Sequence, residues 1–425
     1  MELYEHQIEA LNLTAGQNRV AYYLDMGLGK TFVGSEKMKQ LGTNFNLVIC
    51  QKSKIQDWMD HFMEHYDMNP CDLTKVKADK LKDFIEVSKH VPVPSVYIIN
   101  YDLVFRRPEL KQLENFTLML DESSLIQNET AKRSKFILKM NPKNVILLSG
   151  TPTAGKYEKL WSQIHLLGWL ISKDLYWKQY VDTEIIDNEG YPIRVVRGYK
   201  NVERLKTKLR QHGAIFMKSE EVFDLPEKMF IDTRVNTTKE YRKFRKDCIV
   251  EVDDHELVGD TTLTKMLYER MLCGQYNQDK LIAFRNIVES TEDRLIVFYN
   301  FNEELAILND VAFSLDRPVS VINGKKRDLA AYETKDDSIT FIQYQAGARG
   351  GNHQKANKII YFTPPISSEL YEQSKKRTHR IGQDKTCFYY RLICRNSIEE
   401  KIYNTLAMRK DYTDDLFEQD AQEIY

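Results

Sequence analysis

The sequence predicts an α/β protein with two domains. Two series of short apolar segments, each of strand length, alternate with stretches of helical spacing. Continuous apolar strands separated by helices are typical of parallel sheets covered on both faces. The chain has 425 residues, which is too many for a single hydrophobic core. We therefore expect one domain over residues 1–225, with a helical and hairpin insertion at about 160–220, and a second over residues 226–425.

The apolar segments define the expected strands. The first series comprises residues 20–24, 47–50, 96–100, 117–120 and 145–148. The second series comprises residues 295–299, 319–322, 339–342, 359–362 and 389–393. Each series supplies enough strands for one parallel sheet.

The region between the two series has a different pattern. Residues 161–170 have helical spacing, and residues 184–196 predict a hairpin that turns at 188–190. A basic helix is expected over 202–211, and the stretch 238–288 reads as mainly helical. We place the domain boundary near Leu225-Pro226-Glu227.

Composition fits a globular protein, with 42% hydrophobic and 29% charged residues. No apolar run approaches the length of a membrane span, and the polar N-terminus does not resemble a signal peptide. The six cysteines include no Cys-x-x-Cys pair, so we expect a reducing compartment and no structural zinc.

Charge is balanced overall but uneven along the chain, with a net charge of −1. Basic residues cluster in 194–210, 239–246 and 375–395, whereas acids concentrate in 251–260 and in the segment from Asp411. Each basic cluster has two interpretations, a solvated helix face or a track that binds phosphates.

A glycine-rich turn follows the first expected strand. Asp25-Met26-Gly27-Leu28-Gly29-Lys30-Thr31 lies between that strand and a helix expected over 32–41. Glycines allow backbone N–H groups to approach phosphate oxygens, and a helix N-terminus adds partial positive charge. Lys30 could reach the β- and γ-phosphates, and the Thr31 hydroxyl could hold Mg²⁺. The alternative is a simple turn with a solvated lysine.

Two acids end the strand at 117–120. We expect Asp121 to hold Mg²⁺ through water and Glu122 to orient and deprotonate the attacking water. Surface acids or helix caps are the alternative. The turn Ser149-Gly150-Thr151-Pro152 could sense the γ-phosphate, or could be only a tight loop.

Arg377 and Arg380 lie three residues apart, on one face of an expected helix. Arginines supplied from a second domain stabilise the charge that develops on the phosphoryl oxygens during transfer. An ordinary basic helix is the alternative.

These motifs, in this order, resemble the Swi/Snf-like ATPases of the superfamily-two helicases, over nearly the whole chain. The resemblance adds Leu3 to Gln7 as an adenine-reading segment, 48–53 through Trp58 as motif one-a, and 345–352 as motif five. Arg380-Ile381-Gly382-Gln383 is its most specific local signal. Ser123-Ser124 and Thr363-Pro364-Pro365 depart from the usual family residues.

The resemblance implies two RecA-like lobes with ATP in a cleft between them, and DNA-stimulated ATP hydrolysis. It assigns catalytic roles to Lys30, Glu122, Arg377 and Arg380, and ATP and Mg²⁺ as cofactors. The residues expected to bind nucleotide are Gln7, Gly27, Gly29, Lys30, Thr31, Asp121, Gly350 and Gln373, with Thr31 and Asp121 holding Mg²⁺.

The resemblance also implies a track of double-stranded DNA, contacted through its backbone without reading sequence. The candidate contacts are Lys52, Ser53, Lys54, Lys325, Lys326, Arg327, Arg349 and Asn352. We expect a DNA translocase that remodels DNA or protein–DNA complexes. A strand-separating DNA or RNA helicase, a nucleotide-gated DNA-binding scaffold with little turnover, and a phosphate-loop kinase are the alternatives.

We further expect a monomer with no membrane partner. The expected location is the cytoplasm in a bacterial or viral setting, or the nucleus in a eukaryote. The sequence does not indicate protein partners.

Overall fold

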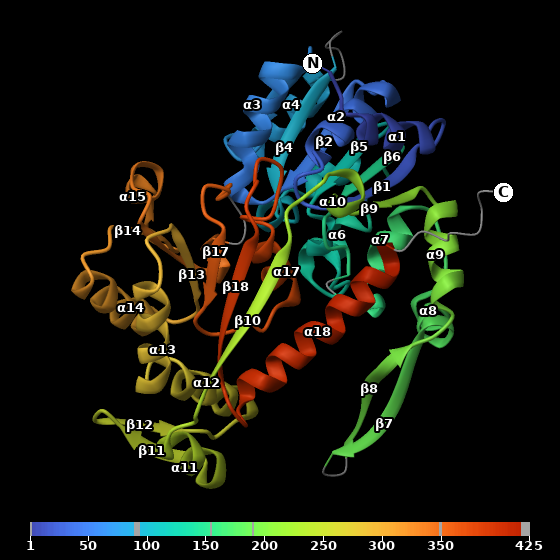
Figure 1. The fold of residues 1–425 in the computed structure, drawn as a ribbon. Coiled ribbons are helices and arrows are strands. Elements are labelled where there is room, and N and C mark those ends of the chain that lie inside the picture. The colour runs from blue at the N-terminus through green and yellow to red at the C-terminus, as the bar shows by residue number, and fades with distance from the viewer. Residues whose placement is uncertain (1, 89–93, 154, 189–190, 348–350, 418–425) are drawn as a thin grey trace, which may run out of the picture. The chain divides into compact units, whose positions relative to one another are not determined.

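The computed structural model describes residues 2–88, 94–153, 155–188, 191–347 and 351–417. Two compact units are present, the first formed by Met1–Val222 together with the segment from Asp411, and the second by Phe223–Lys410, and each is built around its own mostly parallel sheet (Figure 1). The predicted α/β class with two parallel-sheet domains is confirmed.

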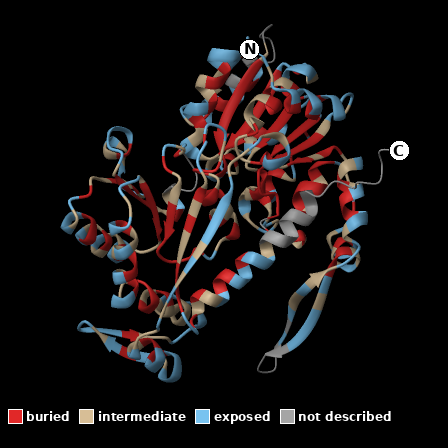
Figure 2. Cartoon of the chain, viewed as in Figure 1, coloured by how far each residue is buried: buried red, intermediate tan, exposed pale blue. Residues whose placement is uncertain are grey.

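The first unit contains a seven-stranded sheet in which every neighbouring pair of strands is parallel. The strands, in sheet order, are β3 (Asn69–Asp72), β4 (Ser95–Asn100), β2 (Phe45–Cys50), β5 (Thr117–Asp121), β6 (Asn144–Leu148), β1 (Arg19–Leu24) and β9 (Ala214–Met217). All residues of β2, β4 and β6 are buried, as the red strands of Figure 2 illustrate. Because both faces of these strands are buried, they contain mostly apolar residues and could be predicted from the sequence.

The helices of the first unit lie between these strands in the chain. They are α1 (Glu5–Leu13), α2 (Lys30–Leu41), α3 (Ile55–His65), α4 (Leu81–Ser88), α5 (Tyr101–Val104), α6 (Lys132–Ile137), α7 (Trp161–Leu166), α8 (Lys173–Tyr180), α9 (Val202–Gln211) and α10 (Ser219–Val222). The predicted hairpin is also present, as β7 (Val181–Asn188) paired antiparallel with β8 (Tyr191–Tyr199). It extends away from the rest of the first unit and is largely exposed (Figures 1 and 2).

The second unit contains another seven-stranded sheet. Its strands, in order, are β10 (Lys228–Val235), β18 (Cys387–Cys394), β17 (Lys358–Tyr361), β13 (Leu295–Tyr299), β16 (Ile339–Gln343), β14 (Val319–Ile322) and β15 (Arg327–Asp328). All neighbours are parallel except the short β14–β15 pair.

Helices connect the strands of the second unit. They are α11 (Lys239–Asp247), α12 (Thr262–Cys273), α13 (Gln278–Glu289), α14 (Asn302–Ser314), α15 (Ala330–Thr334), α16 (Tyr344–Gly347), α17 (Ser368–Lys375) and α18 (Ile398–Phe417). The stretch 238–288 is not helical throughout, because β11 (Ile249–Val252) and β12 (His255–Val258) form an antiparallel hairpin within it. Asp253 and Asp254 turn this hairpin with φ of 49° and 61°, a conformation that Asp tolerates better than most residues.

Besides the β11–β12 hairpin, strands β3, β9, β10 and β15 were not predicted, and of these only the short β9 is a continuous apolar run. Half-exposed β3 contains Pro70, and β9 has only four residues after a basic helix. Exposure alternates along most of β10, at the edge of its sheet. An edge strand with one solvated face does not give the apolar signal of a fully buried strand.

Candidate active site

The motif residues of the first unit gather at one edge of its sheet. Parallel strands β2, β5, β6 and β1 are consecutive neighbours, so the segments that follow them emerge at their common carboxyl edge. Those segments begin at Gln51, Glu122, Ser149 and Asp25 respectively. The carboxyl edge of an open α/β sheet is where such folds bind ligands.

The glycine-rich turn has the backbone conformation that its glycines predict. Gly27 and Gly29 have φ of 93° and 71°, which L side chains rarely adopt. Helix α2 begins at Lys30, whose Nζ donates to the carbonyl oxygens of Leu24 at 2.8 Å and Asp25 at 3.0 Å. This Nζ also lies 3.3 Å from the point that a Cβ at Gly150 would occupy. The ammonium group is thereby held between the turn and the Ser149–Pro152 segment.

Gln7 packs directly against the same turn. Its Nε2 donates to the carbonyl of Leu28 at 3.3 Å, and its Oε1 accepts from the backbone N–H of Tyr4 at 3.0 Å. A Cβ on Gly29 would lie 2.1 Å from the Gln7 Nε2. The close approach of α1 to the turn therefore requires glycine at position 29.

Asp121 is held by an indole group. Trp58 Nε1 donates to Asp121 Oδ2 at 2.9 Å, and the Tyr101 hydroxyl donates to the Asp121 carbonyl at 3.0 Å. Burial raises the pKa of Asp121, although the Trp58 hydrogen bond acts in the opposite direction. Trp58 lies on α3, directly after the 3₁₀ turn Lys52–Lys54.

Glu122 has a left-handed backbone conformation, with φ of 59°. Its Oε1 accepts from the hydroxyl of Ser149 at 2.7 Å and from that of Ser124 at 3.0 Å. Strained backbone of this kind persists where the surrounding contacts hold it, often at functional sites. The carboxylate is thus oriented by the turn after β6 as well as by its own segment.

The unusual Ser123 belongs to a second, buried network. Its hydroxyl donates to Gln163 Oε1 at 2.7 Å, which also accepts from the Tyr23 hydroxyl at 3.0 Å. Gln163 Nε2 donates to the Pro152 carbonyl at 2.8 Å. Ser123 therefore connects the acidic turn to the Ser149–Pro152 segment through α7.

These residues fit a magnesium-bound nucleoside triphosphate. The turn contains two positive-φ glycines, and the Lys30 ammonium group lies inside the turn. Asp121, with Thr31 in the first turn of α2, provides the oxygen donors that Mg²⁺ prefers. Gln7 contacts the turn through its bond to the Leu28 carbonyl. At Gly27, no atom lies within 4 Å of the position that a Cβ would occupy.

The arginine pair of the second unit lies beyond the end of α17 at Lys375, in turns rather than on the predicted helix, and contacts the segment 351–353. Arg377 is 5% exposed and donates to the carbonyl of Gly351 at 2.8 Å, while its Nε has no partner among the described residues. Burial, together with Arg380 and Arg327, lowers its pKa to about 10. Arg380 donates to the side chain of Asn352. A buried cation with an unsatisfied donor is suited to a bound anion.

His353 completes this basic cluster. It is fully buried, and neither ring nitrogen has a partner in the described part of the chain. Burial lowers its pKa to about 4, and Arg377 adds to that effect. Arg327 Nη2 lies 3.3 Å from the position of a Cβ on Gly351, so Arg327 contacts the arginine cluster as well as belonging to the expected DNA track.

Other predicted residues take different positions. Gln373 donates to Glu369 in its own helix, Lys54 pairs with Asp57 at 2.6 Å, and Lys326 pairs with Asp328 at 3.0 Å. Lys52, Ser53 and Lys325 are exposed. Arg349 and Gly350 lie outside the described residues.

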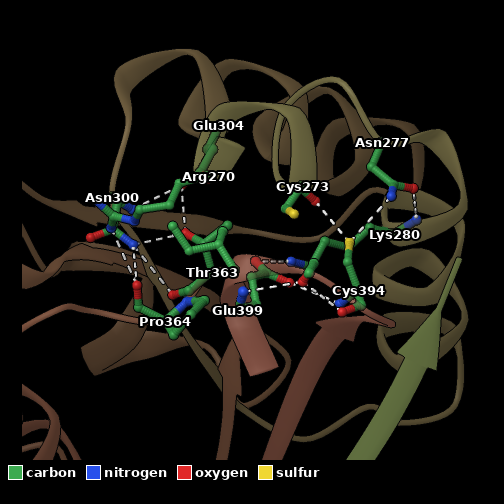
Figure 3. A network of polar contacts seen from close by, with 12 residues as sticks. Arg270, Cys273, Asn277, Lys280, Asn300, Glu304, Thr363, Pro364, Cys394 and Glu399 are labelled. Carbon is green, nitrogen blue, oxygen red and sulfur yellow. Dashed lines mark hydrogen bonds and ion pairs between the residues drawn. The ribbon is translucent and has the colours of Figure 1, made fainter. Parts of the chain in front are cut away.

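The departure at Thr363-Pro364 is accommodated by a buried polar network, drawn in Figure 3. Asn300 Nδ2 donates to Thr363 Oγ1 at 2.8 Å and to the Pro364 carbonyl at 3.1 Å. Thr363 Oγ1 in turn donates to Glu304 at 3.0 Å, and Arg270 donates to the Pro364 carbonyl at 3.3 Å. The turn is therefore held by Arg270 of α12, Glu304 of α14 and Asn300 of the loop between β13 and α14.

Sequence reasoning missed several residues that shape the two clusters. Nothing in the sequence spacing indicated that Trp58 would contact Asp121, that Ser149 would contact Glu122, or that His353 would lie beside Arg377. All three depend on pairings between segments that are distant in the chain. The only available signal was that each residue lies in or beside a matched motif.

Two family models match the chain. Residues 6–280 match the SNF2-related domain, and residues 279–382 match the helicase conserved C-terminal domain. The chain is 24% identical, over 96% of its length, to the ISWI chromatin-remodeling complex ATPase ISW2 of Saccharomyces cerevisiae, of which it covers 40%. It is 23% identical, over 93% of its length, to the putative ATP-dependent helicase/translocase YwqA of Bacillus subtilis, of which it covers 46%.

A solved structure, the Sulfolobus solfataricus SWI2/SNF2 ATPase core in complex with dsDNA, is similar with a TM-score of 0.44 and 20% identity. The match covers 97% of this chain and 92% of that one. The chain spans less than half the length of the two curated relatives named above. In the described part of the chain, no helix combines the length and apolar character needed to cross a bilayer. Because the SNF2-related domain alone matches more than half of its residues, the chain belongs to the SNF2-related family.

Proposed function

We propose that this chain hydrolyses ATP to move along double-stranded DNA. The observation that carries the proposal is that Lys30, at the start of the helix after β1, and Asp121 and Glu122, at the end of β5, belong to the same carboxyl edge of one parallel sheet, in which β6 alone separates β1 from β5. A phosphate-binding cation, a metal-binding carboxylate and a candidate base are the groups that phosphoryl transfer to water requires. The relatives' names describe remodelling ATPases and a helicase/translocase, which agrees with this reaction class.

Each residue of the first unit would have a distinct role. Backbone N–H groups of the glycine-rich turn would bind the phosphates, and Lys30 would move from the Leu24 and Asp25 carbonyls to the β- and γ-phosphate oxygens. Glu122, oriented by Ser149, would position and deprotonate the attacking water. Bound Mg²⁺ would neutralise phosphate charge, with Thr31 and Asp121 holding it.

The second unit would supply the electrophilic groups. Guanidinium groups stabilise charge on the equatorial oxygens during phosphoryl transfer, and Arg377 and Arg380 are the candidates. The unsatisfied Nε of buried Arg377 supports this role. ATP-dependent engagement and release of these arginines would then change how the chain grips its track.

Double-stranded DNA is the proposed track. Exposed Lys52, Ser53 and Lys325 and half-buried Lys54 support backbone contacts, because such side chains can neutralise phosphates without reading bases. Lys54 and Lys326 would exchange their present carboxylate partners for phosphates.

The test is the ATP hydrolysis rate measured with double-stranded DNA, single-stranded DNA and RNA as separate stimulants. We expect duplex DNA to stimulate most, with displacement of a triplex strand but no unwinding of a plain duplex. Unwinding of the duplex would indicate a strand-separating helicase instead. DNA binding without stimulated turnover would indicate a nucleotide-gated scaffold.

Three variants test the assigned roles. Lys30→Ala should abolish turnover, and Glu122→Gln should retain ATP binding but lose hydrolysis. Arg380→Ala should slow turnover by roughly 10³-fold, the range for arginines that stabilise phosphoryl transfer. Near-normal rates in any variant would contradict the role given to that residue.

A further inference from the structure

Helix α11 of the second unit carries a basic stripe that lies outside every matched motif. Lys239, Arg242, Lys243 and Lys246 are spaced i, i+3, i+4 and i+7, which places them on one face of the helix. All four side chains are exposed. We call these four residues the α11 stripe.

The opposite face of α11 fixes the helix to its unit. Tyr241 and Phe244 are buried in a small core with Val250, Leu257 and Leu272. The Tyr241 hydroxyl accepts from the backbone N–H of Ile398 at 2.8 Å. The basic side chains are therefore presented from a rigid helix rather than from a loose loop.

No ion pair among the described residues neutralises the α11 stripe. None of its four side chains has a hydrogen-bond or ion-pair partner within the described ranges. By contrast, exposed Lys326 pairs with Asp328 at 3.0 Å and exposed Arg197 with Glu184 at 2.6 Å. Like charges three and four residues apart destabilise a helix, so the stripe works against the stability of α11 unless an anion binds it.

Four further acidic groups lie on the hairpin that adjoins α11. Glu251, Asp253, Asp254 and Glu256 are all exposed on β11, β12 and their turn, which pack beside α11 (Figure 1). Helix α11 itself carries two acids, Glu240 and Asp247, beside its four stripe cations. The basic groups are therefore concentrated on the helix, and the hairpin carries the larger share of the acids. A polyanion would bind with α11 facing it and the hairpin turned away.

We propose that the α11 stripe binds the phosphate backbone of duplex DNA, as an additional contact beyond the helicase motifs. The stripe extends over about 10 Å, since seven residues of helix rise about 1.5 Å each. Duplex DNA carries one negative charge per about 1.7 Å of its axis, so a stripe of this length faces several phosphates. This inference rests on the proposed function for the identity of the anion.

The test is the salt dependence of DNA affinity for the full chain. Binding of a fluorescent 30-bp duplex is measured by anisotropy from about 50 to 200 mM NaCl, without nucleotide. The stripe variant combines Lys239→Gln, Arg242→Gln, Lys243→Gln and Lys246→Gln. Glutamine retains helix propensity, so α11 should still form. A two-residue variant, Arg242→Gln with Lys246→Gln, covers the case in which the full variant misfolds.

A matched control removes the same charge elsewhere. It combines Lys77→Gln, Lys80→Gln, Lys82→Gln and Lys335→Gln, all at exposed positions. Each lost phosphate contact lowers the slope of log affinity against log salt by about 0.9. We expect the stripe variant to lose about 2 or more in slope, the two-residue variant about 1, and the control less than about 0.5.

The outcomes separate this inference from the proposed function. If the unaltered chain does not bind duplex DNA, the proposed function fails first. If it binds and the stripe variant keeps the unaltered slope, or loses no more than the control, the α11 contact is wrong. If the stripe variant loses affinity for poly-glutamate but not for DNA, the occupant is an acidic protein segment and the DNA assignment is overturned.

Discussion

Trp58 donates its indole N–H to Asp121 at 2.9 Å, which joins helix α3 to the acidic end of β5. The bond to Oδ2 restricts the orientation of the carboxylate, which in the proposed reaction would hold a magnesium-bound water. The segment that precedes α3 holds Lys52, Ser53 and Lys54. A proposed phosphate-contacting segment and a proposed magnesium ligand are therefore connected through one side chain.

Trp58→Phe removes this donor while retaining most of the aromatic packing. We expect the Mg²⁺ concentration for half-maximal ATP binding and turnover to rise about 3- to 10-fold, because outer-shell partners of metal ligands act at or above this range. Fluorescent-nucleotide binding titrated with Mg²⁺ is the measurement. The control is Trp161→Phe, which removes a 2.9 Å indole bond to the Ile171 carbonyl elsewhere in the unit. Equal effects of the two substitutions would contradict the role of Trp58.

Ser149→Ala tests the 2.7 Å bond from the turn after β6 to Glu122. A hydrogen bond to a charged group contributes about 1.5–3 kcal/mol, so its loss should lower kcat roughly tenfold or more with little change in KM. Steady-state ATP hydrolysis measures both constants. Ser134→Ala is the matched control, because its buried hydroxyl has no partner among the described residues. A Ser149 variant that raises KM alone would indicate a binding role instead.

The two acidic positions illustrate what the sequence could and could not predict. An apolar run into Asp121-Glu122 is visible in the sequence because a parallel strand buried on both faces permits few polar residues. The Ser149 and Trp58 contacts were not predictable, because they depend on which strands become neighbours. Edge strand β10 was missed because its exposed side chains resemble a loop. Burial on both sides produces a sequence signal, whereas pairing between distant segments does not.

Gly29→Ala should weaken nucleotide binding strongly. The added methyl would approach Gln7 Nε2 to 2.1 Å at a residue whose φ is 71°, so both the turn and α1 would have to move. We expect more than a tenfold loss of ATP affinity in a fluorescent-nucleotide titration. Gly42→Ala is the control for the cost of placing alanine at a positive φ. The φ of Gly42 is 64°, and nothing lies within 4 Å of the new Cβ. That control should cost about 1–2 kcal/mol of stability and leave ATP affinity unchanged.

His61 should make the stability of the first unit depend on pH. It is buried on α3, with Nε2 3.0 Å from the Ser35 hydroxyl, and burial, followed by the charge of His65, lowers its pKa from 6.5 to about 4. The unfolded chain therefore binds more protons than the folded chain between pH 6.5 and 4. The stability contribution is complete above pH 6.5 and is lost as the pH falls towards 4.

His61→Gln should flatten this dependence in urea unfolding measured at several pH values. A shift of this size corresponds to roughly 3 kcal/mol between the two limits. His255→Gln, at an exposed position of β12, is the control and should leave the profile as it is. An unchanged slope in the His61 variant would show that other groups cause the acid sensitivity.

Lys280 and Glu399 form a fully buried ion pair in the second unit, at 2.5 Å (Figure 3). The other carboxylate oxygen of Glu399 accepts from the backbone N–H of Cys394 at 2.9 Å, so the pair joins the starts of α13 and α18 to the end of β18. Lys280→Met leaves a buried carboxylate without its cation. We expect a loss of about 3–5 kcal/mol in the free energy of unfolding, measured by urea denaturation.

The double variant Lys280→Met with Glu399→Leu should recover most of that loss, because a buried ion pair can be replaced by apolar residues at little cost. The exposed pair Lys355–Glu333 provides the comparison, and Lys355→Met should change the unfolding free energy by less than about 1 kcal/mol. If the double variant is as unstable as Lys280→Met, the carboxylate has a structural role beyond balancing charge. Its bond to the Cys394 N–H, at the point where β18 turns into α18, would then be the contact that the fold requires.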